Sequence, residues 1–142
     1  MQQFKPVTKQ DGAKLRRYYK NCDYGLCEYS LGTKLMWRKV LHPAWAEIAG
    51  CLVVRNRDDN GWNFDYPVPG PEGDVEAALR AIEDYCLEEG QLPVISMVPE
   101  PSLLVTARRC LLWISSSSVM KPVWVYSVQP EGLFSSLLPL LW

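Results

Sequence analysis

The segment from residue 24 to residue 39, YGLCEYSLGTKLMWRK, concentrates side chains that can take part in chemistry. Glu28 supplies a carboxylate, which can orient or deprotonate an amine or hydroxyl group if its pKa is tuned. Tyr29, Trp37 and Arg38 add aromatic surface and a cation. One interpretation therefore makes Glu28 a catalytic residue and Tyr29, Trp37 and Arg38 substrate-binding residues, in a cleft between a helix pair and a sheet.

The same segment also has a purely structural interpretation. Ser30 has the side chain of a helix N-cap and stands before an apolar stretch. The apolar residues can then enter the core while Trp37 covers them. In this interpretation the core residues are Leu31, Leu35 and Met36, and the residues in solvent are Lys34, Arg38 and Lys39. Both interpretations are open at this point.

A second candidate site is the loop PVPGPEGD at residues 67–74, which leads into an expected helix. Backbone N–H groups at a helix start and the helix dipole favour an anion, so Gly70 and Gly73 are candidates for binding the pyrophosphate of a cofactor. However, three prolines remove donors from this loop, and Glu72 and Asp74 repel phosphate. The alternative is a rigid turn followed by an ordinary helix cap.

Other chemistries find little support in the sequence. The single histidine, His42, precedes a proline at an expected helix end, and no G-x-S-x-G, Walker or G-x-G-x-x-G motif is present. The five cysteines form no Cys-x-x-Cys pair and, with one histidine, have no zinc-ligand spacing. We therefore predict no metal site and interpret the cysteines as reduced, mostly buried thiols, with a Cys22–Cys27 redox pair as the alternative.

Length and charge limit the class of protein. The chain has 142 residues and a formal net charge of −1, from 15 Lys and Arg against 16 Asp and Glu. This is the size of one compact domain, and the balanced charge provides no global attraction for nucleic acid or an anionic membrane. The start, MQQFKPVTKQDG, lacks a signal-peptide layout, and no stretch reaches the roughly 18 apolar residues of a membrane span. We expect a cytoplasmic location and no transmembrane segment.

Local patterns predict the elements that must position these residues. A short strand at residues 3–7 precedes Thr8, which stands three residues before Asp11 at the spacing of a capping box and opens a helix. A second helix over residues 31–40 ends at His42-Pro43. Residues 45–49, 51–56 and 61–66 predict an antiparallel meander with a turn at Asn60-Gly61. Its expected aromatic face consists of Trp62, Phe64 and Tyr66.

The helix at residues 74–89 is the clearest in the chain, because Asp74 caps it, an apolar stripe includes Ile82, and Gly90 stops it. A strand at 92–98, a short helix at 99–109 and a strand at 123–128 follow. The whole order predicts an α+β fold in three layers, with a mixed, mostly antiparallel sheet flanked by helices. It is also the element order of the N-acetyltransferase-like fold.

The last part of the chain differs in composition, since residues 111–142 contain only two charged residues, Lys121 and Glu131. We therefore divide the chain into an acetyltransferase-like unit at residues 1–110 and an atypical apolar tail at 111–142. The tail either packs into the domain or meets further protein. Truncation or a change of reading frame after about residue 110 is one explanation for its composition.

Four segments together carry a family resemblance: FKPVTKQDGAKLRRYY, CEYSLGTKLMWRK, WAEIAGCLVVRNRDD and YPVPGPEGDVEAALRAI. From about residue 3 to residue 100, the chain resembles the N-terminal unit of the domain of unknown function that is shared with the C-terminal region of phosphatidylglycerol lysyltransferase. The positions that carry the resemblance are Glu28, Ser30, Trp37, Arg38, Gly70, Gly73 and Asp74. The chain departs from this family because it lacks a second meander.

This resemblance implies an acyltransferase or aminoacyltransferase unit that acts with a second tandem unit. It implies acyl-coenzyme A or aminoacyl-tRNA as the donor, and a lipid head group or tRNA as a further partner. The alternative is a non-catalytic half-module that serves as a structural or interaction domain and self-associates through the tail. We expect the isolated 142 residues to transfer no acyl or aminoacyl group.

Overall fold

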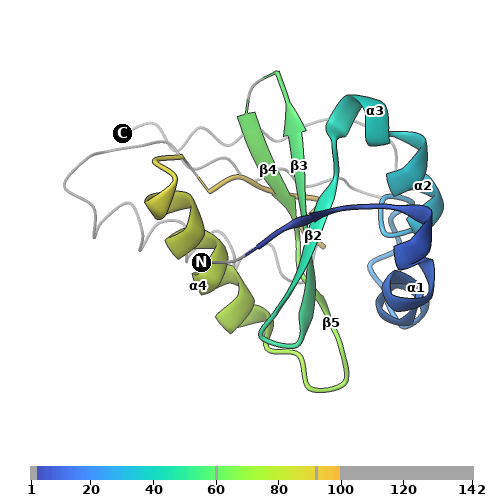
Figure 1. Ribbon diagram of the computed structural model, residues 1–142. Coiled ribbons are helices and arrows are strands. Elements are labelled where there is room, and N and C mark those ends of the chain that lie inside the picture. Colours follow the sequence, from blue (N-terminus) through green and yellow to red (C-terminus); the bar gives the residue numbers. More distant parts are fainter. Residues whose placement is uncertain (1–2, 60, 92, 100–142) are drawn as a thin grey trace.

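The computed structural model describes residues 3–59, 61–91 and 93–99 (Figure 1). Its strands and helices, in chain order, are β1 (Lys5–Pro6), the 3₁₀ helix η1 (Lys9–Asp11), α1 (Gly12–Lys20), α2 (Leu31–Met36), α3 (Arg38–Leu41), β2 (Ala44–Ile48), β3 (Cys51–Asp58), β4 (Gly61–Asp65), β5 (Val68–Pro69), α4 (Val75–Glu88) and β6 (Ile95–Ser96).

The strands form one mixed sheet in the order β1-β2-β3-β4-β6, and β5 also pairs with β3. All pairs are antiparallel except β4 with β6, which is parallel. The predicted α+β fold class with a mixed, mostly antiparallel sheet is therefore confirmed. Among the described residues, no helix combines the length and apolarity that a bilayer span requires.

Helices cover both faces of this sheet. Figure 1 shows α4 on one face and α1, α2 and α3 on the other. The pleat of β3 and β4 divides their side chains accordingly, because residues that pair across antiparallel strands share a face. Arg55 pairs with Phe64, and Asn56 pairs with Asn63. The first pair lies on the α4 face and the second pair on the opposite face.

The N-terminal elements begin as their capping residues predict. The backbone amide and hydroxyl of Thr8 both donate to the Asp11 carboxylate, at 2.8 and 2.7 Å. Ser30 accepts a hydrogen bond from the Thr33 amide at the start of α2. The single helix predicted over residues 31–40 is instead two short helices. They are separated at Trp37, whose φ of −91° and ψ of 6° depart from α-helical geometry.

The meander and the following helix match the prediction closely. Asp74 accepts from the Ala77 amide at the start of α4, and Gly90, with φ of +65°, follows its last turn. The predicted aromatic face is only partly formed. Phe64 and Trp62 contact Tyr85 of α4, whereas Tyr66, beyond the end of β4, contacts Tyr24.

The strand predicted at residues 92–98 is shorter in the structure, where β6 comprises only Ile95 and Ser96. It ends at Met97, whose φ of +56° is left-handed and incompatible with an extended strand. The turn residue Asn60, the helix predicted at 99–109, the strand at 123–128 and the boundary near residue 110 lie outside the described residues.

Candidate functional site

A cavity of about 300 Å³ lies between the α2–α3 helix pair and the sheet. This volume is at the lower end of the range for small-molecule sites. Apolar side chains form most of its wall, and a few polar groups face it. The lining residues are Glu28, Thr33, Lys34, Trp37, Val40, Leu41, Pro43, Asn56 and Met97.

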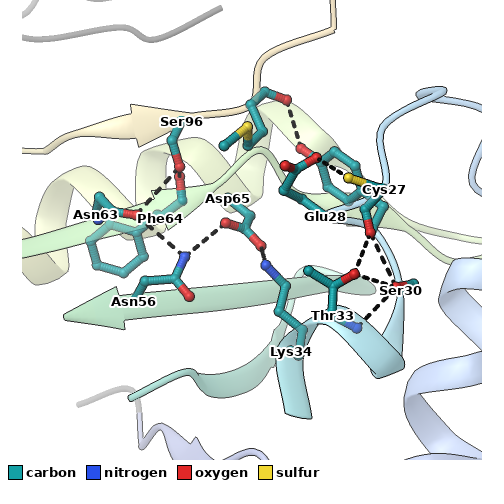
Figure 2. A network of polar contacts seen from close by, with 12 residues as sticks. Cys27, Glu28, Ser30, Thr33, Lys34, Asn56, Asn63, Phe64, Asp65 and Ser96 are labelled. Carbon is teal, nitrogen blue, oxygen red and sulfur yellow. Dashed lines mark hydrogen bonds and ion pairs between the residues drawn. The ribbon is translucent and has the colours of Figure 1, made fainter. Parts of the chain in front are cut away.

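The start of α2 fixes the segment that carries Glu28. The Ser30 hydroxyl donates to the Thr33 hydroxyl at 2.9 Å, and the Thr33 hydroxyl donates to the Cys27 carbonyl at 2.8 Å. Ser30 Oγ also lies 3.1 Å from the same carbonyl oxygen, which can share its proton. These contacts tie the residues before the helix to its first turn. Glu28 is therefore held beside the cavity by the cap of the helix that forms the cavity wall (Figure 2).

The polar side of the cavity is a buried network that joins four elements (Figure 2). Lys34 of α2 forms an ion pair with Asp65 of β4. The other oxygen of Asp65 accepts from Nδ2 of Asn56 on β3 at 2.8 Å. Asn63 then accepts from Asn56 at 3.3 Å and from the Ser96 hydroxyl of β6 at 3.4 Å. The network thus connects the helix pair to three strands.

One acceptor of this network has no partner. Oδ1 of Asn56 is buried and accepts no hydrogen bond within the described part of the chain. The amide orientation is fixed, because Nδ2 donates to Asp65 and a flipped amide would set Oδ1 against that carboxylate. An unpaired buried acceptor costs free energy. The residue that carries it also lines the cavity.

The structure brings together two of the four predicted residues of the cleft. Glu28 and Trp37 line the cavity, whereas Arg38 is exposed and does not line it. Tyr29 is buried, and its hydroxyl donates to the Met97 carbonyl at 2.7 Å. Burial raises the pKa of Tyr29, so its phenol keeps its proton and serves to anchor the backbone at Met97.

Cys27 is exposed and lies beside Glu28, with its thiol 3.4 Å from a Glu28 carboxylate oxygen. The hydrogen bond to Glu28 and the charge of that residue raise the pKa of the Cys27 thiol. Because the thiolate is the nucleophilic form, this environment makes Cys27 a poor nucleophile. The raised pKa therefore gives no support to a role for the Cys27 thiol as a nucleophile.

The Pro/Gly loop lies apart from this cavity, since none of its residues lines it. The Gly70 and Asp74 amides donate to the Gly50 and Ala49 carbonyls, both at 2.9 Å, and the Gly73 amide donates to the Gly70 carbonyl at 3.1 Å. A phosphate at Gly70 or Gly73 would have to displace these acceptors. The geometry favours the rigid-turn alternative for this loop.

The described cysteines are all free: Cys51 and Cys86 are buried, Cys22 is half-buried and Cys27 is exposed. Burial raises the pKa of Cys51 to about 11 and that of Cys86 to about 12, so both remain thiols. Within residues 3–59, 61–91 and 93–99, no three His, Cys, Asp or Glu side chains gather in a group that suits a metal ion.

Two features of this site differ from the structural interpretation of the sequence. Lys34, expected in solvent, is buried, because α2 turns it toward Asp65 at the cavity. Met36, expected in the core, is 69 % exposed. Sequence reasoning also missed Asn56 and Asp65 as site residues. The one available signal was Asp65 at a polar position of an alternating strand, which is equally typical of a solvent-facing residue.

Comparisons with known proteins bear on the fold. The chain matches no protein-family model and no curated protein. A solved structure of a conserved protein of unknown function from Bacteroides thetaiotaomicron superposes with a TM-score of 0.60 at 24 % sequence identity. The match covers 65 % of this chain and 30 % of that one, so this chain spans less than a third of the other protein's length. This likeness shows a shared fold.

Proposed function

We propose that this chain is a phosphatidylglycerol lysyltransferase C-terminal-type domain, an N-acetyltransferase-like unit that transfers an acyl or aminoacyl group together with a second tandem unit. The observation that carries the proposal is the position of Glu28, whose half-buried side chain lines the cavity next to Trp37. These two residues belong to one of the segments that carry the family resemblance. The order of the elements and the sheet with helices on both faces also support the proposal.

In this proposal the cavity holds the acceptor rather than the donor. A volume of about 300 Å³ suits a small amine or alcohol and is too small for a whole coenzyme or a tRNA. The Glu28 carboxylate accepts the proton of the acceptor as its nitrogen or oxygen attacks the carbonyl carbon of the donor. The bond from that carbon to the thiol sulfur of coenzyme A, or to the ribose oxygen of tRNA, then breaks, and the proton passes to the leaving group.

The other cavity residues position the acceptor. Trp37 and Val40 provide apolar wall, and Thr33 provides a hydroxyl. The Lys34–Asp65 pair adds no net charge, so Glu28 carries the one charge without an ion-pair partner among the described residues that line the cavity. Such a cavity favours an acceptor molecule that has an apolar body and one amine or hydroxyl group.

A second candidate function is an interaction module without catalysis. Met36 of α2 and Val40 of α3 are 69 % and 59 % exposed, and Val40 also lines the cavity. Large exposed apolar side chains that lie close together are typical of a contact with further protein. The second tandem unit implied by the family resemblance is the partner that we propose for this surface.

The test is a set of binding and transfer measurements on the full chain. Thermal unfolding is followed with acetyl-coenzyme A, aminoacyl-tRNA and anionic lipid, because a ligand that binds only the native state raises the midpoint. We expect a donor to raise the midpoint without turnover by the isolated chain. Glu28→Gln and Trp37→Ala probe the cavity, and Arg80→Gln, on the far side of the sheet, is the control.

Turnover by the isolated chain that Glu28→Gln abolishes would eliminate the interaction-module candidate. A chain that binds none of the three ligands and transfers no label, even when the second unit of a relative is added, would contradict the transferase proposal. In that case, association of the two units that Met36→Ser weakens would support the interaction module.

A further inference from the structure

Arg55 lies on the other face of the sheet, away from the cavity. It pairs with Phe64 in the β3–β4 ladder, and its side chain points toward α4. The same ladder pairs Arg57 with Trp62, so Arg57 is two residues further along on the same face. This face therefore carries two arginines beside the aromatic residues that pack under α4.

Aromatic rings contact the Arg55 guanidinium. Its central carbon lies 4.4 Å from the centroid of the Trp62 ring and 5.0 Å from that of Phe4. Trp62 in turn stacks on Tyr85 with an interplanar angle of 15°. Cation–π contacts of this kind hold a guanidinium in one position and leave its N–H edge free to form hydrogen bonds.

Described residues occupy little of the hydrogen-bond edge of Arg55. One N–H donates to the Tyr85 hydroxyl at 2.6 Å, and no carboxylate within the described part of the chain forms an ion pair with Arg55. The Arg55 side chain is nevertheless half-buried, which makes a missing counter-charge costly. The Tyr85 hydroxyl accepts from Arg55, so its own proton is available to a further acceptor.

We infer that Arg55 and Tyr85 form a binding site for an oxyanion, a carboxylate or phosphate carried by a small ligand. The planar fork of a guanidinium matches the two oxygens of such a group, and the adjacent Tyr85 hydroxyl is a further hydrogen-bond donor. Phe4 and Trp62 border the site, so they favour an oxyanion attached to an apolar or aromatic body. Arg57 adds positive charge on the same face.

This site is independent of the proposed transfer activity, because the cavity with Glu28 lies on the opposite side of the sheet. Either function can fail while the other holds. The measurement that tests the site is therefore direct binding, with no substrate turnover involved.

The experiment is a titration of the full chain followed by NMR at the Trp62 indole N–H and the Arg55 side-chain N–H. The probes are benzoate, phenyl phosphate and inorganic phosphate, and neutral benzamide is the matched control. We expect saturable shifts with benzoate or phenyl phosphate that weaken as salt is added, and none with benzamide. The tighter of the two aromatic anions identifies the site as a carboxylate or a phosphate site.

Three variants assign the binding to the named groups. Arg55→Gln should abolish the shifts, and Arg55→Lys should weaken binding, because lysine keeps the charge but loses the fork. Tyr85→Phe should weaken binding roughly tenfold, since one hydrogen bond to a charged group is lost. Arg80→Gln removes one exposed positive charge from the same helix as Tyr85 and should leave binding unchanged.

Two results would overturn the inference. One is the absence of a saturable shift with all three anions. The other is equal binding of benzoate and benzamide, which would show stacking on the rings alone. Because Arg55→Gln can also lower stability, Tyr85→Phe and Arg55→Lys decide the outcome if that variant unfolds: unchanged affinity in both would contradict the assigned site.

Discussion

The Lys34 ammonium group on α2 contacts the Asp65 carboxylate at the end of β4, and both side chains are less than a tenth exposed, at 7 % and 6 %. The pair fixes the helix pair against the sheet at the cavity. Removing two charges from water is costly, so such a pair adds little net stability compared with apolar residues of similar volume. Removing only one partner lowers stability much more, because it leaves a buried charge without a partner.

This asymmetry gives the first prediction. Lys34→Met should lower the free energy of unfolding by about 3–5 kcal/mol, because it leaves the buried Asp65 carboxylate without its ion-pair partner. The double variant Lys34→Met/Asp65→Leu should recover part of that loss, although Asn56 Nδ2 then keeps only its longer hydrogen bond to Asn63. Urea denaturation of the three proteins measures both values. A double variant no more stable than Lys34→Met would show that the network, rather than the pair, is the costly part to break.

The second prediction concerns α4. Ile82 is 1 % exposed in its apolar stripe, whereas Arg80 is exposed and pairs with Glu76 one turn away. Ile82→Asp should cost about 4 kcal/mol or more, since it combines a lost apolar contact with a buried carboxylate. Arg80→Glu should cost only about 0.5 kcal/mol. Similar denaturation midpoints for the two variants would mean that this stripe is not in the core.

The third prediction tests the rigid-turn interpretation of the Pro/Gly loop. A Cβ on Gly73 would lie 2.8 Å from the Gly70 nitrogen and 2.9 Å from the Gly50 carbonyl oxygen, both backbone atoms. Gly73→Ala should therefore destabilise the domain by about 1–3 kcal/mol. Gly32→Ala is the matched control. Its Cβ meets no atom within 4 Å, so alanine in α2 should stabilise the domain by about 0.5–1 kcal/mol.

A fourth prediction concerns thiol reactivity. Cys27 is exposed, so an alkylating reagent should modify it in the native protein, whereas the buried Cys51 and Cys86 should react only after unfolding. Because Glu28 raises the pKa of the Cys27 thiol, Glu28→Gln should lower that pKa and speed labelling at neutral pH. Peptide mapping by mass spectrometry after timed alkylation follows each site. Labelling of Cys86 as fast as Cys27 in the native state would contradict its burial.

The fifth prediction is a loss of stability in alkali. Burial raises the pKa of Cys86 from 9.0 to about 12, so the native state keeps this proton while the unfolded state releases it near pH 9. The contribution of the Cys86 proton to the free energy of unfolding is complete below pH 9 and falls as the pH rises toward 12. Between pH 8 and pH 10 the loss should be about 1 kcal/mol per buried thiol.

Urea unfolding at both pH values measures this loss, and two alanine variants serve as its controls. Cys86→Ala should be less stable at both pH values and show a smaller pH dependence. Cys27→Ala removes an exposed thiol and should keep the full dependence of the parent chain. An identical pH dependence in Cys86→Ala and the parent would assign the effect to other groups.

Local sequence patterns predicted the elements but not the network. The Trp62 and Phe64 alternation predicted β4, and Asp74 predicted the start of α4, because each signal lies within a few residues of its effect. Lys34 and Asp65 are far apart in the chain, and each alone is typical of a solvent-facing residue. Their meeting depends on how α2 crosses the sheet, which no local pattern specifies.

The parallel pairing of β4 with β6 has a consequence for the order of folding. Strands β2, β3 and β4 are joined by short turns, so their pairing closes only small loops. Pairing of Phe64 with Ile95 instead closes a loop that contains all of α4, at a larger entropic cost. We therefore expect β6 to join the sheet late. Ser96 belongs to this strand, so the polar network is complete only at the end of folding, and a chain interrupted between α4 and β6 would form the meander without the finished site.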